Sequence, residues 1–121
     1  MITVTQGEFL ERTGIDLTAS LRAYGIDNDK MADILLTRWT KRIYNEAKNC
    51  GFPIRDTQLT EFQLDALIDS ICEYGNYCFH KGDFIVNGGV DEDGKDIKDM
   101  LPKIIQDLKD AGLIRNNLKG R

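Results

Sequence analysis

Three side chains near the middle of the chain could do chemistry: the thiol of Cys78, the imidazole of His80 and the carboxylate of Asp83. A thiol beside an imidazole is the arrangement of a cysteine nucleophile with its base, and all three groups can bind metal ions. Cys78 and His80, however, are two residues apart in a segment predicted to be helical, so they point to different faces. We interpret His80, the only histidine, as a cation that stabilises the end of that helix.

The cysteines do not have the spacing of a metal site. Cys50, Cys72 and Cys78 are an odd number, and the closest two are six positions apart instead of forming a C-x-x-C pair. We expect buried, reduced thiols.

The glycine-rich segment that follows comes close to a phosphate-binding loop. Gly89–Asp96 differs at one position from the pattern G-x-x-x-x-G-K-[ST]. Asp91, Glu92 and Asp93 would lie inside the phosphate cradle, and Asp96 replaces the hydroxyl that binds magnesium. We interpret the match as a coincidence.

The same acids also match part of a calcium-binding loop. With its turn at Gly94, an EF-hand requires an acid at position 89 and a glutamate at position 100, where this chain has glycine and methionine. Weak, unselective cation binding stays open as the alternative to a solvated acidic loop. The chain also lacks G-x-S-x-G, H-E-x-x-H and G-x-G-x-x-G, so we expect no enzyme activity and no cofactor.

The element that positions these residues is a predicted central helix from Thr60 to about Lys81. Thr60 and Gln63 match a capping box, and Gly82 is a typical helix stop. Gly75 in the interior indicates that another helix or an aromatic ring comes close to the backbone. The apolar positions recur at helical spacing and are Leu64, Leu67, Ile68, Ile71, Cys72, Cys78 and Phe79.

Three helices are predicted before this one and one after it. The predicted ranges are 6–12, 17–24, 27 or 28 to 49, and 96 or 99 to 111. Trp39 lies in the apolar stripe of the third helix, where a core position is expected. The predicted fold is all-α: a compact bundle of two long antiparallel helices with shorter N- and C-terminal helices.

We expect residues 1–121 to form one domain, with two segments outside the helices. Residues 82–96 hold four glycines and five acids, and we predict a long mobile loop or weak hairpin there. Residues 114–121 hold three bases and no acid, and we predict a basic tail.

The composition of the 121 residues is that of a soluble domain of ordinary size, 41% hydrophobic and 30% charged. The net charge of −4 disfavours a protein whose main work is to grip nucleic acid. No apolar run approaches the roughly 20 residues of a membrane span, and no signal-peptide pattern is present. We therefore expect a protein made in the cytoplasm, with no membrane and no small-molecule substrate among its partners.

Two stretches carry a family likeness: L-T-E-F-Q-L-D-A-L-I-D-S-I-C-E-Y-G-N-Y at Leu59–Tyr77, and L-K-D-A-G-L-I-R at Leu108–Arg115. A glycine- and acid-rich segment and a short helix lie between them. In these stretches and in its order of elements, the chain resembles the small helical head–tail connector (adaptor or neck) proteins of tailed bacteriophages and prophages. Cys72 and Gly75 depart from the pattern, since ordinary helix formers are expected at both positions.

The resemblance implies a structural role in the neck of a virion, after synthesis in the cytoplasm of a bacterial host. Such subunits form a ring with copies of themselves and dock between the portal protein and the next neck or tail protein, with DNA passing through the lumen. An acidic segment of one subunit can meet a basic segment of its neighbour, and an acidic lumen would keep DNA from adhering. The expected partner-contact residues are Phe84, Ile85, Val86, Asp91, Glu92, Asp93, Arg115, Lys119 and Arg121.

The alternative function is that of a small helical regulatory protein that binds DNA or a protein partner. Its basis is the basic face of the helix ending near residue 49, formed by Arg38, Lys41, Arg42 and Lys48. The acidic net charge and the lack of a recognisable helix-turn-helix pattern disfavour this alternative.

Overall fold

The computed structural model describes residues 1–51, 53–83 and 100–114. These residues form five α-helices and one short 3-10 helix, with no strand among them, so the all-α prediction is confirmed for this part of the chain. The α-helices are α1 (Gln6–Thr13), α2 (Leu17–Ala23), α3 (Met31–Asn49), α4 (Glu61–His80) and α6 (Leu101–Asp110), and the 3-10 helix η1 is Asp56–Gln58.

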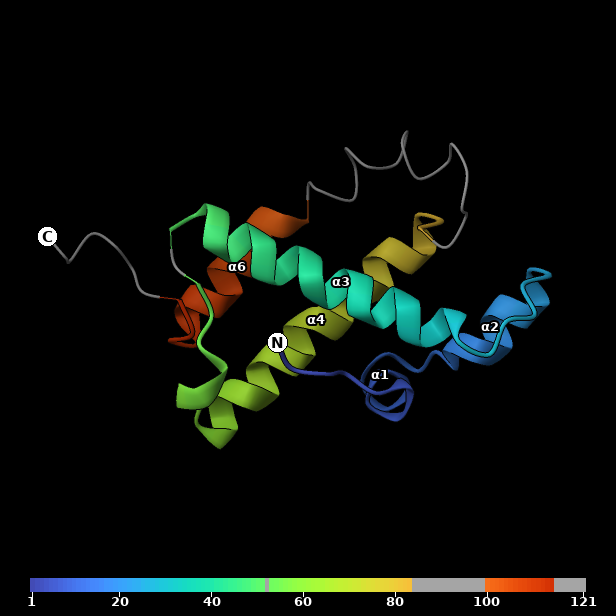
Figure 1. Ribbon diagram of the computed structural model, residues 1–121, viewed down its shortest axis with the longest axis horizontal. Helices are drawn as coiled ribbons and strands as arrows, with labels where there is room; N and C mark the ends of the chain where they lie inside the picture. The colour runs from blue at the N-terminus through green and yellow to red at the C-terminus, as the bar shows by residue number, and fades with distance from the viewer. Residues whose placement is uncertain (52, 84–99, 115–121) are drawn as a thin grey trace, which may run out of the picture.

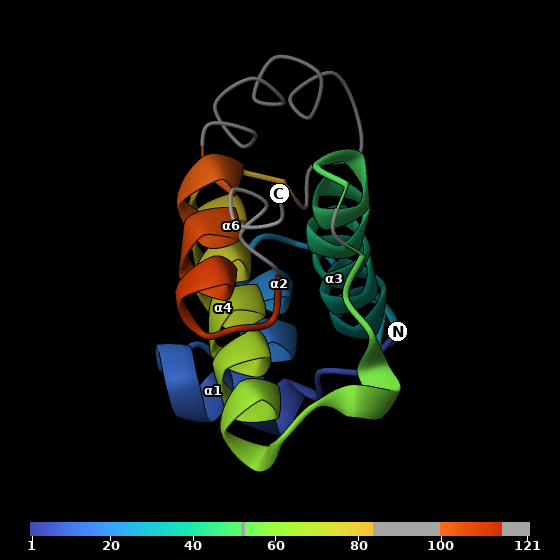
Figure 2. The same ribbon diagram turned by 90° about the vertical axis from the view of Figure 1, so that its left-hand side faces the viewer.

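Helix α4 is at the centre of a compact arrangement, as predicted. It packs against α1, α3 and α6, while α2 packs against α1 and α3. The two long helices, α3 and α4, cross each other in the view of Figure 1. Figure 2 shows α6 beside α4, with α3 on the other side of the molecule's core.

The helix ends follow the local sequence signals. Capping boxes are present at Thr5–Glu8 and Thr60–Gln63, with the threonine hydroxyls accepting from the backbone N–H groups of Glu8 and Gln63 at 3.1 Å. The carboxylate of Glu8 and the amide oxygen of Gln63 accept in return from the threonine N–H groups. The capping box predicted at Thr60 is confirmed, and the same pattern T-x-x-E forms one at Thr5.

Helix α3 begins at Met31, later than predicted. Asn28 caps a preceding turn instead, because its Oδ1 accepts from the N–H of Lys30 at 2.9 Å and its carbonyl accepts from Met31 at 3.1 Å. The short polar side chain favours this local turn over the helix start.

The core is centred on Trp39, which is fully buried, and contacts the ring of Phe9 with centroids 5.7 Å apart. The indole lies directly against Gly75: a Cβ at that position would be 2.5 Å from Trp39 Cε3 and 3.1 Å from Phe9 Cε1. The prediction that an aromatic ring approaches the backbone at Gly75 is confirmed.

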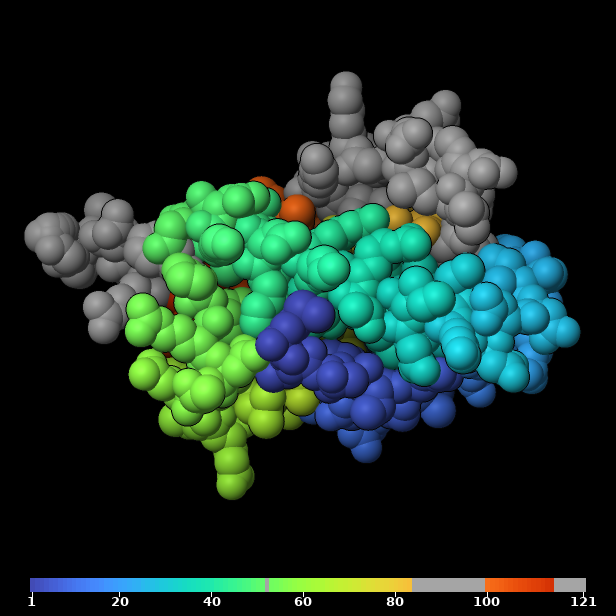
Figure 3. All heavy atoms as spheres, viewed as in Figure 1, coloured from blue at the N-terminus to red at the C-terminus, as the bar shows by residue number. Residues whose placement is uncertain are grey.

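The N-terminal segment and the segment between α3 and α4 both pack against α3 near its C-terminal end. Tyr44 Oη accepts from the N–H of Ile2 at 3.2 Å and donates to Asp56 at 2.6 Å. Figure 3 shows the first residues lying across this face, beside the segment that leads to α4. Ile54 in that segment belongs to the buried core.

Three predictions about burial are wrong. Leu64 is 38% exposed because it lies in the first turn of α4, beyond the reach of the packed neighbours. Cys50 is exposed, whereas Cys72 and Cys78 are buried as expected. Ile114 is buried in the core and does not begin a tail.

No described helix combines the length and the apolar character needed to cross a membrane.

Candidate functional site

The most unusual described group is Asp83, a fully buried carboxylate at the end of α4. Gly82 takes a left-handed conformation with φ 81°, and the N–H of Asp83 donates to the carbonyl of Cys78 at 3.0 Å. This is a Schellman turn, which needs glycine at its left-handed position and turns the chain back over the last helical turn. The turn aims the Asp83 side chain at α3.

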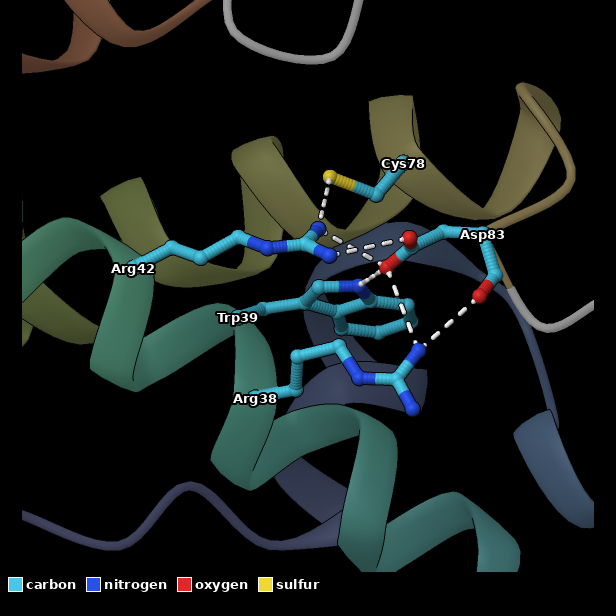
Figure 4. Close-up of polar contacts among 5 residues, drawn as sticks. All are labelled: Arg38, Trp39, Arg42, Cys78 and Asp83. Carbon is cyan, nitrogen blue, oxygen red and sulfur yellow. Dashed lines mark hydrogen bonds and ion pairs between the residues drawn. The ribbon is translucent and has the colours of Figure 1, made fainter. Parts of the chain in front are cut away.

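Three side chains of α3 donate to Asp83, as Figure 4 shows. Trp39 Nε1 donates to Oδ2 at 2.7 Å. Arg42 binds in a bidentate manner, with Nη1 2.9 Å from Oδ2 and Nη2 3.1 Å from Oδ1. Arg38 donates to the backbone carbonyl of Asp83 at 3.0 Å, and its Nη1 lies 3.8 Å from Oδ2. We call Arg38, Trp39, Arg42 and Asp83 the Asp83 clamp.

The environment of the Asp83 clamp favours the charged form of Arg42. Burial of the guanidinium lowers the pKa of Arg42, but its hydrogen bonds and charge interaction with Asp83 outweigh that effect and the net pKa shift is upward. Because a buried carboxylate is costly unless it is paired and hydrogen-bonded, the three donors are what makes the buried position of Asp83 tolerable.

The neighbouring thiol is not activated by this environment. Cys78 Sγ lies 3.9 Å from Arg42 Nη1, but burial raises the pKa of Cys78 to about 12. The nucleophilic form of cysteine is the thiolate, so a thiol with this pKa is inert at neutral pH. The interpretation of Cys78 as a packing residue agrees with this geometry.

Asp83 is not available to bind a ligand, because it is fully buried and its carboxylate oxygens accept from donors of its own chain. His80 is exposed, and its ring lies beside that of Phe79 with centroids 6.2 Å apart. Among residues 1–51, 53–83 and 100–114, no three His, Cys, Asp or Glu side chains are grouped to hold a metal ion. What the arrangement can do is fix the point at which residue 84 leaves the core.

The Asp83 clamp corrects two sequence interpretations. By sequence Asp83 belongs with the solvated acids of residues 82–96, yet it is buried, because Arg42 and Trp39 compensate its charge. Arg38 and Arg42 are predicted to lie on a basic face available to phosphate, yet both contact Asp83, which leaves Lys41 and Lys48 as the exposed bases of that set.

A local signal for the clamp does exist in the sequence. In a Schellman turn the residue after the glycine is commonly apolar and packs on the helix, so an acid directly after Gly82 is unexpected. Arg38 and Arg42, one helical turn apart around Trp39, are the matching donors. Neither stretch by itself reveals that they meet.

The expected partner-contact residues, all within 84–93 or 115–121, lie outside the described residues. The structure does establish where these two segments leave the core. Residue 84 follows Asp83 at the C-terminal end of α4. Residue 115 follows Ile114 near the N-terminal end of α4, where Gln63 Nε2 donates to the carbonyl of Gly112 at 3.1 Å. Figure 1 shows these two points on opposite sides of the molecule.

Comparison with protein-family models, with curated proteins and with solved structures found no match to this chain.

Proposed function

We propose that this protein is a non-enzymatic structural subunit in the neck of a tailed phage or prophage particle, located in the virion after synthesis in the host cytoplasm. In this proposal it forms a ring, docks between the portal protein and the next neck or tail protein, and leaves a lumen for DNA. Its two long helices serve as the antiparallel pair of a connector bundle. The resemblance of Leu59–Tyr77 and Leu108–Arg115 to connector proteins is the starting point.

The observation that carries the proposal is the separation of two oppositely charged segments. Residues 84–99 contain five acids and two lysines, a net charge of −3, and residues 115–121 contain three bases and no acid, a net charge of +3. They leave the core near opposite ends of α4, because Asp83 is held at Cys78 and Gly112 at Gln63, positions about 22 Å apart along the helix.

A ring of identical copies requires two different surfaces on each subunit that complement one another. Head-to-tail contacts use two different, complementary surfaces on each copy, and copies of one chain then close into a ring if the rotation closes. Residues 84–99 and 115–121 carry opposite net charge and leave the core at different ends of α4. The proposal therefore assigns the acidic segment of a neighbouring copy as the partner of residues 115–121.

The regulatory alternative loses part of its basis. Arg38 and Arg42, two of the four bases that would contact phosphate, bind Asp83. A salt-dependent gel shift with duplex DNA would nevertheless favour the alternative, and no shift at low salt is the expected result.

The test is deletion of this gene from the phage or prophage that carries it. We expect DNA-filled or leaking heads and free tails, a phenotype that wild-type protein rescues in trans. The variant Arg115→Glu, Lys119→Glu should fail to rescue, while a matched reversal of the exposed bases, Lys41→Glu with Lys48→Glu, should succeed. Normal infectious particles from the deletion strain would refute the proposal.

A further inference from the structure

The first two turns of α4 carry an apolar surface that the described residues leave uncovered. The side chain of Phe62 is 72% exposed and that of Leu64 is 38% exposed. They line a shallow hollow of about 510 Å³ together with Glu61, Asp65 and Ile68. We call these five residues the α4 patch. Phe62 and Leu64 point to different sides of the helix, but both line this hollow, and an exposed apolar hollow is typical of a binding surface.

The surroundings of the α4 patch are acidic. Glu61 and Asp65 within it and Asp69 one turn further along contribute three carboxylates, and Arg12 is the cation that faces them. Arg12 Nη2 lies 2.7 Å from Asp65 Oδ1, and Nη1 lies 3.6 Å from Asp69 Oδ1. One guanidinium against three carboxylates leaves a net charge of −2, which favours a basic occupant with an apolar side chain.

A segment of that chemistry begins at the same end of α4. Residues 115–121 read R-N-N-L-K-G-R, with three bases around a single leucine, Leu118. Gln63, which lies between Phe62 and Leu64 in sequence, holds the carbonyl of Gly112 at 3.1 Å, and Leu113 and Ile114 are buried. Gln63 faces the other side of α4 from the centre of the α4 patch, and the seven residues after Ile114 reach at most about 25 Å, enough to pass around a helix about 10–12 Å wide.

We propose that residues 115–121 bind the α4 patch of the same chain, with Leu118 on Phe62 and the bases beside the carboxylates. A short connection gives a tethered segment a millimolar effective concentration, which a second copy or another protein does not reach at ordinary dilution. In the free subunit the basic segment is then held in place, and any partner that needs it must displace it. This contact does not depend on the connector role.

The experiment measures how fast trypsin cleaves the full-length protein after Arg115 and Lys119, followed by intact mass. The double variant Glu61→Gln, Phe62→Ala should be cleaved there about three to ten times faster than wild type, because the segment is released. Leu118→Ser should have the same effect without a change in α4. The matched control Asp33→Asn, Ile34→Ala removes an acid and an exposed apolar residue from the first turn of α3 and should leave the rate unchanged.

Equal cleavage rates for wild type, the patch variant and Leu118→Ser would overturn the proposal. Protection that grows with protein concentration, from about 5 to about 200 µM, would assign the α4 patch to a second copy and would also overturn it. Concentration-independent protection supports binding within one chain. Because the readout uses the free protein, failure here is distinguishable from failure of the deletion test for the connector role.

Discussion

At the scale of single residues, Asp83 determines how the end of α4 is joined to α3. Its carboxylate is fully buried and accepts from Trp39 and Arg42. A buried ion pair of this kind adds little net stability compared with an apolar pair, but loss of one partner leaves the other uncompensated. The sensitive experiment is therefore removal of one member of the pair.

We predict that Asp83→Ala lowers the free energy of unfolding by about 2–4 kcal/mol, since it leaves the Arg42 guanidinium and the Trp39 N–H without their acceptor. Urea denaturation measures the change. Asp83→Asn should cost less, because the amide oxygen can still accept from Trp39. Asp27→Ala, at a carboxylate whose side chain is 87% exposed, is the control and should change stability by less than about 0.5 kcal/mol. Equal effects at the two positions would contradict the clamp.

The thiols differ in reactivity for a physical reason. Cys50 is exposed, whereas burial raises the pKa of both Cys72 and Cys78 to about 12. We predict that one of the three thiols reacts quickly with DTNB in the native protein, and that Cys50→Ser removes the fast phase. Rapid reaction of two or three thiols would show that the core around α4 opens readily.

The raised pKa values of Cys72 and Cys78 predict a loss of stability at high pH. A group whose pKa is raised on folding keeps its proton in the native state while the unfolded chain releases it. From the ordinary cysteine value of 9.0 up to about 12, the unfolded state therefore binds fewer protons and the free energy of unfolding falls as the pH rises. Urea midpoints at successive pH values measure this fall, which Cys72→Ala with Cys78→Ala should reduce and Cys50→Ser should leave unchanged.

At the scale of elements, the packing of α4 on α3 depends on the missing side chain at Gly75. Alanine there gains helix propensity worth about 1 kcal/mol, but its Cβ would lie 2.5 Å from the buried Trp39 ring. Overpacking of a rigid core costs about 1–3 kcal/mol, so we predict a net loss of up to about 2 kcal/mol for Gly75→Ala.

Gly7 provides the matched comparison, because it is also a helical glycine. A Cβ at Gly7 would meet only Thr5 Oγ1, at 3.9 Å. We predict that Gly7→Ala stabilises the protein by about 0.4–1 kcal/mol. Denaturation of both variants measures the difference in sign, and a stabilising Gly75→Ala would mean that Trp39 is not held against α4.

At the scale of the whole molecule, one core joins the five α-helices of the described residues, since each contributes buried residues to a single cluster around Trp39 and α4. We predict one cooperative unfolding transition, with the same urea midpoint by Trp39 fluorescence and by far-UV circular dichroism. Two separated midpoints would show that the α1–α2 region, or α6, unfolds on its own.

The sequence by itself determined the helical class and most helix ends. Capping boxes at Thr5 and Thr60 and the glycine stop at Gly82 involve groups within a few residues of one another, so their hydrogen bonds form wherever the chain goes. The apolar stripe of α4 was also predictable from its helical period, apart from Leu64 at the uncovered first turn.

Only the tertiary structure decided which charges are free and where the charged segments begin. Asp83 meets Arg42 across 41 positions of sequence, and Gln63 meets Gly112 across 49. Local patterns do not encode such distances, because the partner is set by how helices pack and not by residue spacing. The acid after Gly82 could be noticed in the sequence, but its burial, and the opposite exits of residues 84 and 115, follow from the packing of α3 and α6 on α4.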